Sequence, residues 1–364
     1  MITCVEKRSD GICLYLMEND ELRVLVSSYG VTILELAMKG LDGQWHNVIL
    51  GYPSLEDYMA KHGTYFGAIV GRTANRLANG QFTLHGKTYH IPINNGPNSL
   101  HGGIEGFSYQ NFASQIGGDQ LDFVYVSQDL EEGYPGNLSL WVTLRLEGNS
   151  LRIVYDADCD QDTLCSLTHH LYFNLSDGDT IDHHLLQVGA LRHGLVDSSG
   201  LCTGHFREVL GTPLDFSKLT YVKQGYDMRD EQIALANGID HHFVLEDNVP
   251  QVILIDPFSK RSLLVESTFP GVQLYSGNYI DPYVDRFKGV LSQHAGLAIE
   301  PQIVPDSIHN QEHPQAILKA GQSYHQEICY HLYRQPDLAF AGNCLEDFTL
   351  LSHKDPRELI AQND

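Results

Sequence analysis

The chain has 364 residues, with 46 acidic against 23 basic side chains and a formal net charge of −23. Such an acidic surface repels phosphate backbones and anionic lipids, so we expect neither nucleic acid nor a membrane as a partner. The first twenty residues carry charges before any apolar run, and no segment has the length of a membrane span, so we expect a cytoplasmic protein. Seven scattered cysteines without a CxxC pair fit free thiols in a reducing compartment.

Short alternating segments predict β-strands along most of the chain. Segments rich in Val, Leu, Ile, Tyr and Thr occupy residues 21–27, 31–37, 121–127, 138–146, 151–157, 252–255 and 263–266. Turn residues at 85–87 and 147–150 predict two hairpins. Short helices are expected at 54–62, where Ser54 is available as the N-cap, and at 356–362. The pattern predicts a mainly β protein with few short helices.

The organisation of the chain favours one large domain. There is no internal repeat of fixed period and no low-complexity linker. Strand alternation ends near residue 334. We therefore expect a single antiparallel β-sandwich over residues 1–334 and an extension of unknown function, residues 335–364, that packs outside it.

The run FGAIVGRTANRLANGQFTLHGKTYHIPINNGPNSLHGGIEGF, residues 66–107, sets Asn75, Arg76, Asn98 and His101 among glycines and short apolar strands. Glycines permit sharp turns or a close approach by a ligand. Such a surface suits a small polyhydroxylated molecule. A hairpin whose polar loop residues are merely solvated is an equal alternative at this point.

The segment SLTHHLYFNL, residues 166–175, reads as a strand with two distinct faces. One face carries polar Thr168, His170, Tyr172 and Asn174, and the other is apolar except for His169. A polar strand face is ordinarily the solvated side of a sheet. His170 could instead lie in a groove where Tyr172 and Asn174 orient its ring.

Two acidic residues stand at strand ends. Asp240 in NGIDHHFVL follows a glycine turn, and Glu300 in GLAIEPQIVPDSIH ends an apolar run and precedes a proline that favours extended backbone. Asp240 could simply cap its turn. Glu300 could form a structural ion pair with Arg72 or Arg76.

Metal binding and nucleophilic catalysis have little support. In the pairs His169/His170 and His241/His242, only one histidine of each would face a given side of a sheet, so no HxH or HxxxH set arises. No GxSxG elbow is present, and no cysteine has the setting of an activated thiolate. We expect neither a metal nor another cofactor.

Six motifs together give a family resemblance. GRTANRLANGQF, PNSLHGG, LTHHLYFNL, GIDHHFVL, FPGVQLYSGN and GLAIEPQIVPD resemble the aldose 1-epimerase (galactose mutarotase) family, in that family's order. The resemblance spans roughly residues 20–334. It implies a galactose mutarotase-like β-sandwich that interconverts the α and β anomers of free aldoses such as galactose and glucose, without a cofactor. Whether the protein forms a homodimer is left open.

The resemblance also implies roles for eight residues. Glu300 matches the general base and His170 the general acid. The positions that hold sugar hydroxyls or support the acid are Asn75, Arg76, His101, Tyr172, Asp240 and Gln273. His169 stands where the family usually has Asn, and Leu171 where it commonly has Ser, which puts the local hydrogen bonding beside His170 in question.

Mutarotation needs one base and one acid. An ordinary Glu pKa of about 4.3 would leave Glu300 ionised at neutral pH, whereas an ordinary His pKa of about 6.5 would leave His170 only about a quarter protonated. We therefore expect Asp240 to lie near His170 and raise its pKa. The alternatives are a non-catalytic sugar-binding sandwich, a hexose-6-phosphate 1-epimerase, for which extra cations near the groove are expected, and a glycosidase.

Overall fold

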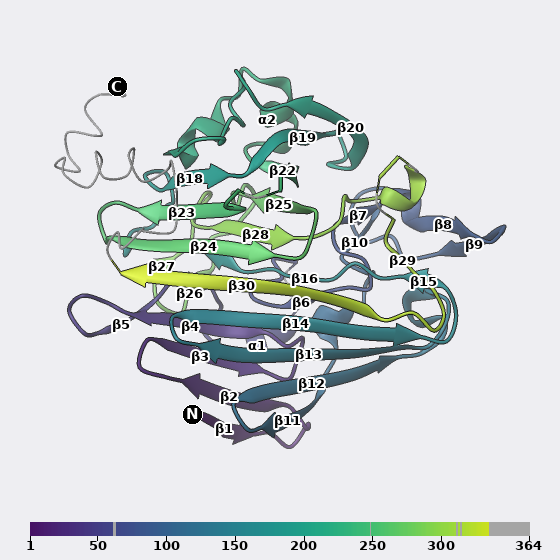
Figure 1. The fold of residues 1–364 in the computed structure, drawn as a ribbon, viewed down its shortest axis with the longest axis horizontal. Coiled ribbons are helices and arrows are strands. Elements are labelled where there is room, and N and C mark those ends of the chain that lie inside the picture. Colours follow the sequence, from purple (N-terminus) through teal and green to yellow (C-terminus); the bar gives the residue numbers. More distant parts are fainter. Residues whose placement is uncertain (61–62, 248, 311, 314, 335–364) are drawn as a thin grey trace.

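The fold, seen in a computed structural model, consists mainly of antiparallel sheets in a β-sandwich (Figure 1), as the sequence predicted. The structure describes all residues except 61–62, 248, 311, 314 and 335–364. Two short α-helices, α1 (Leu55–Met59) and α2 (Glu231–Ala236), accompany the sheets in the described part of the chain. None of its helices is long and apolar enough to cross a membrane.

The largest sheet has nine strands. In spatial order they are β11 (Ala113–Gly117), β12 (Gln120–Ser127), β13 (Leu138–Glu147), β14 (Ser150–Cys159), β30 (Tyr324–Arg334), β24 (Arg261–Ser267), β23 (Val252–Asp256), β18 (Leu185–Val188) and β21 (Thr220–Tyr221). The long strands β12, β13, β14 and β30 lie side by side in Figure 1. This sheet therefore joins the middle of the chain to its last described strand.

Two further sheets complete the layers. A six-stranded sheet contains β17 (Tyr172–Phe173), β28 (Leu297–Pro301), β25 (Gly271–Tyr275), β22 (Asp240–Leu245), β19 (Ala190–Val196) and β20 (Cys202–Glu208) in spatial order. A five-stranded sheet contains β1 (Ile2–Lys7), β2 (Cys13–Glu18), β3 (Leu22–Ser27), β4 (Ile33–Lys39) and β5 (Trp45–Asn47). The six-stranded sheet carries four of the eight residues of the site described below.

Five two-stranded ladders accompany these sheets. They are β7 (Arg76–Leu77) with β10 (Ser99–Leu100), β16 (Thr168–His169) with β6 (Ile69–Val70), β8 (Gln81–Leu84) with β9 (Lys87–His90), β15 (Thr163–Leu164) with β29 (Ile317–Leu318), and β26 (Val284–Asp285) with β27 (Gly289–Val290). The β8–β9 hairpin projects from the body of the molecule (Figure 1).

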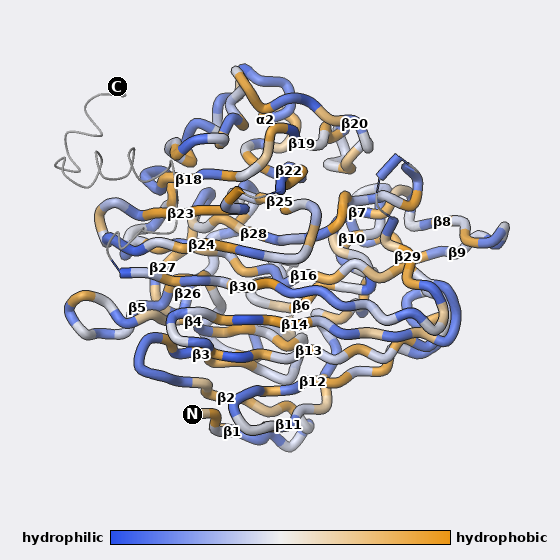
Figure 2. Tube along the Cα trace, in the orientation of Figure 1, coloured by the Kyte–Doolittle hydropathy of each residue, from blue (hydrophilic) through white to orange (hydrophobic). Residues whose placement is uncertain are grey.

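The core follows from strand alternation, and Figure 2 shows hydrophobic and hydrophilic residues interspersed along β13 and β14. Leu138, Leu140 and Val142 of β13 are fully buried and belong to one apolar cluster with Val272 of β25 and Ile299 of β28. One face of the six-stranded sheet therefore packs into the core. The polar residues of the same strands point the other way.

Most local predictions are confirmed. All seven predicted strands are present with ends shifted by at most two residues, and both hairpins form, with Leu84 paired to Lys87 and Glu147 to Ser150. The predicted helix at 54–62 is shorter, and Ser54 caps it in a capping box with Asp57. The six cysteines in the described residues are free. The predicted helix at 356–362 and the extension 335–364 lie outside the described residues.

Candidate active site

The six-stranded sheet turns a polar face away from the core. Across β22, β25 and β28 the register places His242 opposite Gln273 and Gln273 opposite Glu300. Along β22 and β25, Asp240 pairs with Tyr275. Directly paired residues of an antiparallel sheet share a face. Asp240, Gln273 and Glu300 therefore project together from three neighbouring strands, although they lie far apart in the sequence.

A cavity of about 190 Å³ opens over this face. Its lining includes all eight residues singled out from the sequence: Asn75, Arg76, His101, His170, Tyr172, Asp240, Gln273 and Glu300. Pockets for drug-sized ligands are larger, roughly 300–1,000 Å³, so this cavity suits one small molecule. Sequence reasoning missed Tyr65, Asn95, Tyr275 and Tyr279, which also line it. Tyr275 stood inside the motif FPGVQLYSGN and Asn95 inside the run 66–107, but neither was singled out.

The ladder of β7 with β10 holds Asn75 and His101 together at one wall. The backbone N–H of His101 donates to the carbonyl of Asn75 at 3.1 Å, and both residues adopt a positive φ. Gly102 is required here, because a Cβ at this position would lie 1.9 Å from the carbonyl oxygen of Gly71. Gly102 thus serves close backbone packing. Of the four polar residues singled out in this run, Asn75, Arg76 and His101 line the cavity, whereas Asn98 donates to the hydroxyl of Ser199 instead.

The tautomer of His101 is set by its neighbour. The backbone N–H of Asn75 donates to Nδ1 of His101 at 3.2 Å, so Nδ1 carries the lone pair and Nε2 carries the hydrogen in the neutral ring. Burial, with help from His170 and Arg76, holds the pKa of His101 well below its ordinary value. His101 is therefore a neutral hydrogen-bond donor, as a residue that binds a sugar hydroxyl should be.

Asp240 is engaged with its neighbours on the wall, which corrects the expected partnership with His170. Gln273 Nε2 donates to Asp240 Oδ1 at 2.6 Å, and Arg76 lies 3.6 Å from Oδ2. The negative charge of Asp240 acts on Glu300, whose pKa it helps to raise, and contributes nothing resolved to the pKa of His170. The strand register places Asp240 opposite Tyr275 and beside Gln273, so its carboxylate is directed to these neighbours and not to His170.

His170 and Glu300 meet at the floor of the cavity. His170 Nε2 lies 3.4 Å from Glu300 Oε1, and both side chains are at least nine-tenths buried. Burial raises the pKa of Glu300 well above its ordinary value, with Asp240 adding to the shift and Arg76 opposing it. Burial lowers the pKa of His170 to about 3. Between the lowered pKa of His170 and the raised pKa of Glu300, the pair carries one proton. Desolvation favours the form in which that proton is on Glu300.

Two expectations about Glu300 and His170 are therefore wrong for the ligand-free protein. Burial keeps Glu300 from ionising as an ordinary carboxyl group would, and Asp240 does not raise the pKa of His170. The alternative of an ion pair between Glu300 and Arg72 also fails. Arg72 is 2% exposed and donates to Ser127 and to backbone carbonyls, including that of Pro135.

The segment that carries His170 is not one strand. It breaks into β16, which pairs with β6, and β17, which joins the six-stranded sheet, and His170 lies between them. Its supposedly solvated face is buried throughout. The His170 ring stacks on Tyr172 at 4.8 Å between centroids and lies at 6.1 Å from the near-parallel ring of Tyr65. These contacts fix the plane of the imidazole.

His169 points away from the cavity, which answers the question raised by its departure from the family pattern. Its Nδ1 lies 2.6 Å from the hydroxyl of Tyr155, and its Nε2 lies 3.1 Å from the carbonyl of Val31. The carbonyl can only accept, so Nε2 donates and Nδ1 accepts from Tyr155. Leu171 is also fully buried in the core. Neither residue touches the reacting pair.

A possible metal-binding trio was not foreseen from the sequence. Ligand atoms of His101, His170 and Glu300 all lie within 4.8 Å of one another, and two histidines with a carboxylate are a familiar metal donor set. The two His-His pairs gave no hint of it, because His101 comes from a separate loop. The tautomer of His101 opposes the set, since the N–H of Asn75 occupies Nδ1 and leaves a hydrogen on Nε2.

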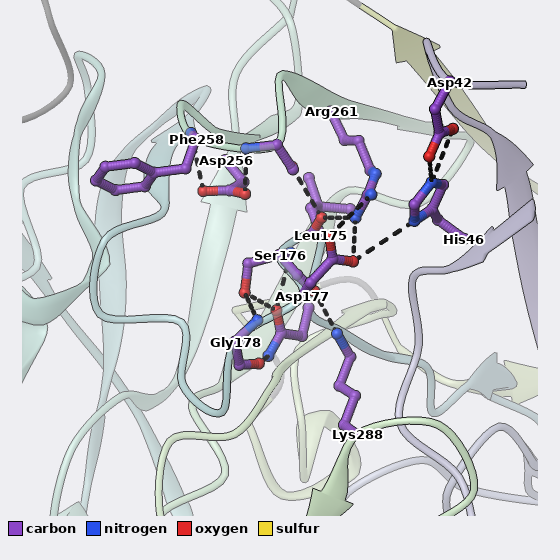
Figure 3. Close-up of polar contacts among 12 residues, drawn as sticks. Asp42, His46, Leu175, Ser176, Asp177, Gly178, Asp256, Phe258, Arg261 and Lys288 are labelled. Carbon is purple, nitrogen blue, oxygen red and sulfur yellow. Dashed lines mark hydrogen bonds and ion pairs between the residues drawn. The ribbon is translucent and has the colours of Figure 1, made fainter. Parts of the chain in front are cut away.

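Beyond β17, a cluster of charges anchors the chain that follows the site (Figure 3). This Asp177 cluster comprises Asp177, Arg261, Lys288, His46 and Asp42. Arg261 donates to the carbonyl of Leu175 and to Asp177, each at 2.9 Å, and Lys288 donates to the carbonyl of Ser176. His46 bridges Asp177 and Asp42. The end of the segment is therefore fixed by paired charges.

Comparison with known proteins gives a consistent family. The family model described as aldose 1-epimerase matches residues 14–331. Galactose mutarotase from Mus musculus is 40% identical over 314 residues, which cover 85% of this chain and 90% of the relative. Aldose 1-epimerase from Haemophilus influenzae is 34% identical over 320 residues, covering 85% of this chain and 92% of that protein.

Solved structures agree with this. An aldose epimerase homologue from C. elegans has a TM-score of 0.82 at 27% identity and covers 88% of this chain and 99% of its own. Galactose 1-epimerase from Lactobacillus acidophilus has a TM-score of 0.80 at 28% identity, with coverage of 92% and 98%. The chain therefore belongs to the aldose 1-epimerase family and is an isomerase.

Proposed function

We propose that this enzyme interconverts the α and β anomers of free aldoses such as galactose and glucose, with Glu300 as general base and His170 as general acid. The observation that carries the proposal is the 3.4 Å contact between Glu300 and His170 on the floor of a cavity whose walls offer hydrogen-bonding groups. The similarity to galactose mutarotases supports the substrate class.

The reaction starts from the form in which Glu300 is ionised and His170 is protonated. Glu300 accepts the proton of the anomeric hydroxyl while His170 donates one to the ring oxygen, so that the bond between C1 and the ring oxygen breaks and an aldehyde forms. Rotation about the C1–C2 bond presents the opposite carbonyl face. Reclosure reverses both proton transfers and returns the pair to its starting form.

Burial of the pair assists ring opening. After the first half-reaction Glu300 is protonated and His170 is neutral, which is the form that desolvation favours, because burial raises the pKa of Glu300 and lowers that of His170. The substrate thus converts a costly buried ion pair into a neutral pair. Arg76, held by Asn95 and Asp240, and the Nε2–H of His101 would fix the ring hydroxyls.

The alternatives have less support. Arg76 is the single lysine or arginine among the described residues that line the cavity, and it is already bonded to Asn95 and close to Asp240, so a sugar phosphate has no free cation there. For a non-catalytic binding protein, a buried acid and base in contact would cost stability without a purpose. For a glycosidase, the second carboxylate would be Asp240, which is committed to Gln273.

Polarimetry of freshly dissolved α-galactose tests the proposal. We expect rapid loss of optical rotation with micromolar wild-type enzyme and a decrease of about 10²–10⁴-fold in the catalysed rate for Glu300→Gln and His170→Gln, since each removes one proton-transfer group. Circular dichroism should show both variants folded. A wild-type rate no faster than buffer, or full activity in either variant, would overturn the assignment. Rates with glucose, xylose, arabinose and glucose 6-phosphate would then define specificity.

A further inference from the structure

His242 lies next to the proposed catalytic base but outside the cavity. It shares the polar face of the sheet with Gln273 and Glu300 through the register of β22, β25 and β28. It is 1% exposed and does not line the cavity. The proposed reaction does not use it. A buried polar ring in this position needs a physical explanation.

Gly271 shows where the ring of His242 lies. A Cβ built on Gly271 would come within 2.3 Å of His242 Nε2, so the imidazole occupies the space that a side chain at residue 271 would fill. Gly271 is the same-face neighbour of Gln273 on β25. Its carbonyl accepts from the backbone N–H of Gln302, two residues beyond Glu300. The ring thus lies beside Gly271, whose backbone is bonded to that of Gln302.

Six buried polar atoms in this part of the sheet have no protein partner among the described residues. They are Nδ1 and Nε2 of His242, Oε1 and Nε2 of Gln302, Oε1 of Gln273 and Oε2 of Glu300. Each atom leaves water on folding, and a buried polar group without a partner destabilises the folded state. Ordered water that makes two to four hydrogen bonds is the usual partner of such groups.

We propose that His242 is a positioning residue for Glu300: with Gln302, it holds ordered water against the buried oxygen Oε2 and so orients the carboxylate while its other oxygen meets His170. The inference rests on the proposed role of Glu300 as base. A neutral imidazole offers one donor and one acceptor, which suits a relay between water and an amide. Burial keeps His242 neutral, with its pKa lowered to about 3.

The surroundings of both groups are defined. Glu300 faces His170 directly and is influenced by Asp240 and Arg76, while its charge in turn affects Tyr172 and Tyr330. The titratable group that acts on His242 is His313, which further lowers its pKa. Loss of a donor toward Glu300 disfavours the ionised carboxylate, so the pKa of Glu300 should rise further.

The test compares His242→Phe, which keeps a ring but no polar atom, with His242→Asn, which keeps a donor and an acceptor. His241 provides the matched control, because it is equally buried on the same strand, also has an unpartnered Nε2 among the described residues, and faces the opposite side toward His193. The corresponding variants are His241→Phe and His241→Asn. Polarimetry over a range of pH gives kcat and KM for each.

We expect His242→Phe to move the alkaline limb of kcat/KM upward by about one pH unit and to lower the plateau about tenfold, because a higher pKa of Glu300 reduces the fraction of the pair in the reactive form. KM should change less than about twofold, since His242 does not touch the sugar. His242→Asn should restore most of the wild-type position of the limb and most of the wild-type plateau. The His241 variants should lower the melting temperature without moving the limb.

Gly271→Ala provides an independent route, since the added methyl group displaces the His242 ring without removing it, and the same shift is expected. A high-resolution crystal structure of the wild-type protein should show water between His242, Gln302 and Glu300. An unmoved limb in His242→Phe, equal behaviour of the Phe and Asn variants, or a dry contact in that structure would overturn the inference. Full turnover by Glu300→Gln would instead overturn the proposed function.

Discussion

The two ends of the segment from β16 to residue 178 differ in how their charged groups are stabilised. At one end His170 meets Glu300 with both groups buried, and one polar atom of each has no partner among the described residues. At the other end Asp177 accepts from Arg261, and Lys288 and His46 complete the cluster (Figure 3). Asp177 has a lowered pKa because Arg261 stabilises its charge, whereas Glu300 has a raised pKa because burial opposes its charge.

Within about ten residues, one end of the segment therefore contributes to stability and the other to the proposed reaction. Paired charges fix the backbone at Leu175 and Ser176, so the segment has a firm anchor. The buried acid and base, each with one polar atom that has no partner among the described residues, cost folding free energy, which proteins tolerate at functional sites. We therefore expect substitutions at the two ends to have separable effects on turnover and on unfolding.

The largest expected effect comes from the double variant Glu300→Gln/His170→Gln. The two residues share one proton and act as a unit. Each single substitution should lower the rate by about 10²–10⁴-fold, and we expect the double variant to be at most about threefold slower than the slower of the two single variants. Its melting temperature should equal or exceed that of the wild type, since an uncompensated buried acid and base are removed. Polarimetry and calorimetry measure both; multiplicative rate losses or a lower melting temperature would contradict the comparison.

Acidification should weaken the folded protein through its buried histidines. The folded-state pKa is lowered to about 3 or 4 for His169, His170, His184, His193, His241 and His242. Below about pH 6.5 the unfolded chain binds protons that the folded chain excludes, so stability falls as the pH decreases toward the folded-state values. Each histidine can contribute up to about 1.4 kcal/mol per pH unit in this window.

The Asp177 cluster should persist through the same range. The lowered pKa of Asp177 means that its ionised carboxylate stabilises the folded state above the ordinary carboxyl pKa. This contribution is lost only as the pH falls through the folded-state pKa of Asp177. Urea unfolding at pH 7.5 and pH 5.5 measures the net result, and we expect a lower midpoint at pH 5.5. An equal or higher midpoint there would show that these histidines are not held neutral.

Asp240→Asn should change the pH profile through Glu300. Loss of the Asp240 charge removes a cause that raises the pKa of Glu300, so the alkaline limb of kcat/KM should move to lower pH, by about one unit or less. KM should rise severalfold because Arg76 and Gln273 lose their partner. Asp177→Asn is the matched control, and it should leave the limb in place. A limb that stays fixed in Asp240→Asn would refute the electrostatic coupling of Asp240 to Glu300.

The sequence was informative about identity and placement. Alternation predicted the long strands, turn residues predicted both hairpins, and the motifs predicted eight residues that all line one cavity. Residue types and strand periodicity carry this information directly. The paired histidines also behave as alternation requires, because His170 faces the cavity while His169 bonds to Tyr155 in the core.

The sequence could not reveal the electrostatics. The protonation of Glu300 and His170 depends on burial by residues from distant segments, and the role of Asp240 depends on its register with β25. The break between β16 and β17 likewise arises because the two halves pair with different strands. Tyr65 was missed because a lone tyrosine before a glycine turn gives no sign that it will stack near His170.

The smallest expected effect on turnover comes from Arg261→Met, at the paired end of the segment. Methionine keeps much of the apolar stem but removes the donors to the carbonyl of Leu175 and to Asp177, so we expect a loss of about 1–3 kcal/mol in the free energy of unfolding. Arg261→Lys should lose less, because it keeps one charged donor. Both variants should retain kcat/KM within about threefold, since the anchor lies away from the reacting pair. A large fall in kcat/KM with unchanged stability would mean that the Asp177 cluster positions His170 for catalysis, and the separation of the two ends would then be wrong.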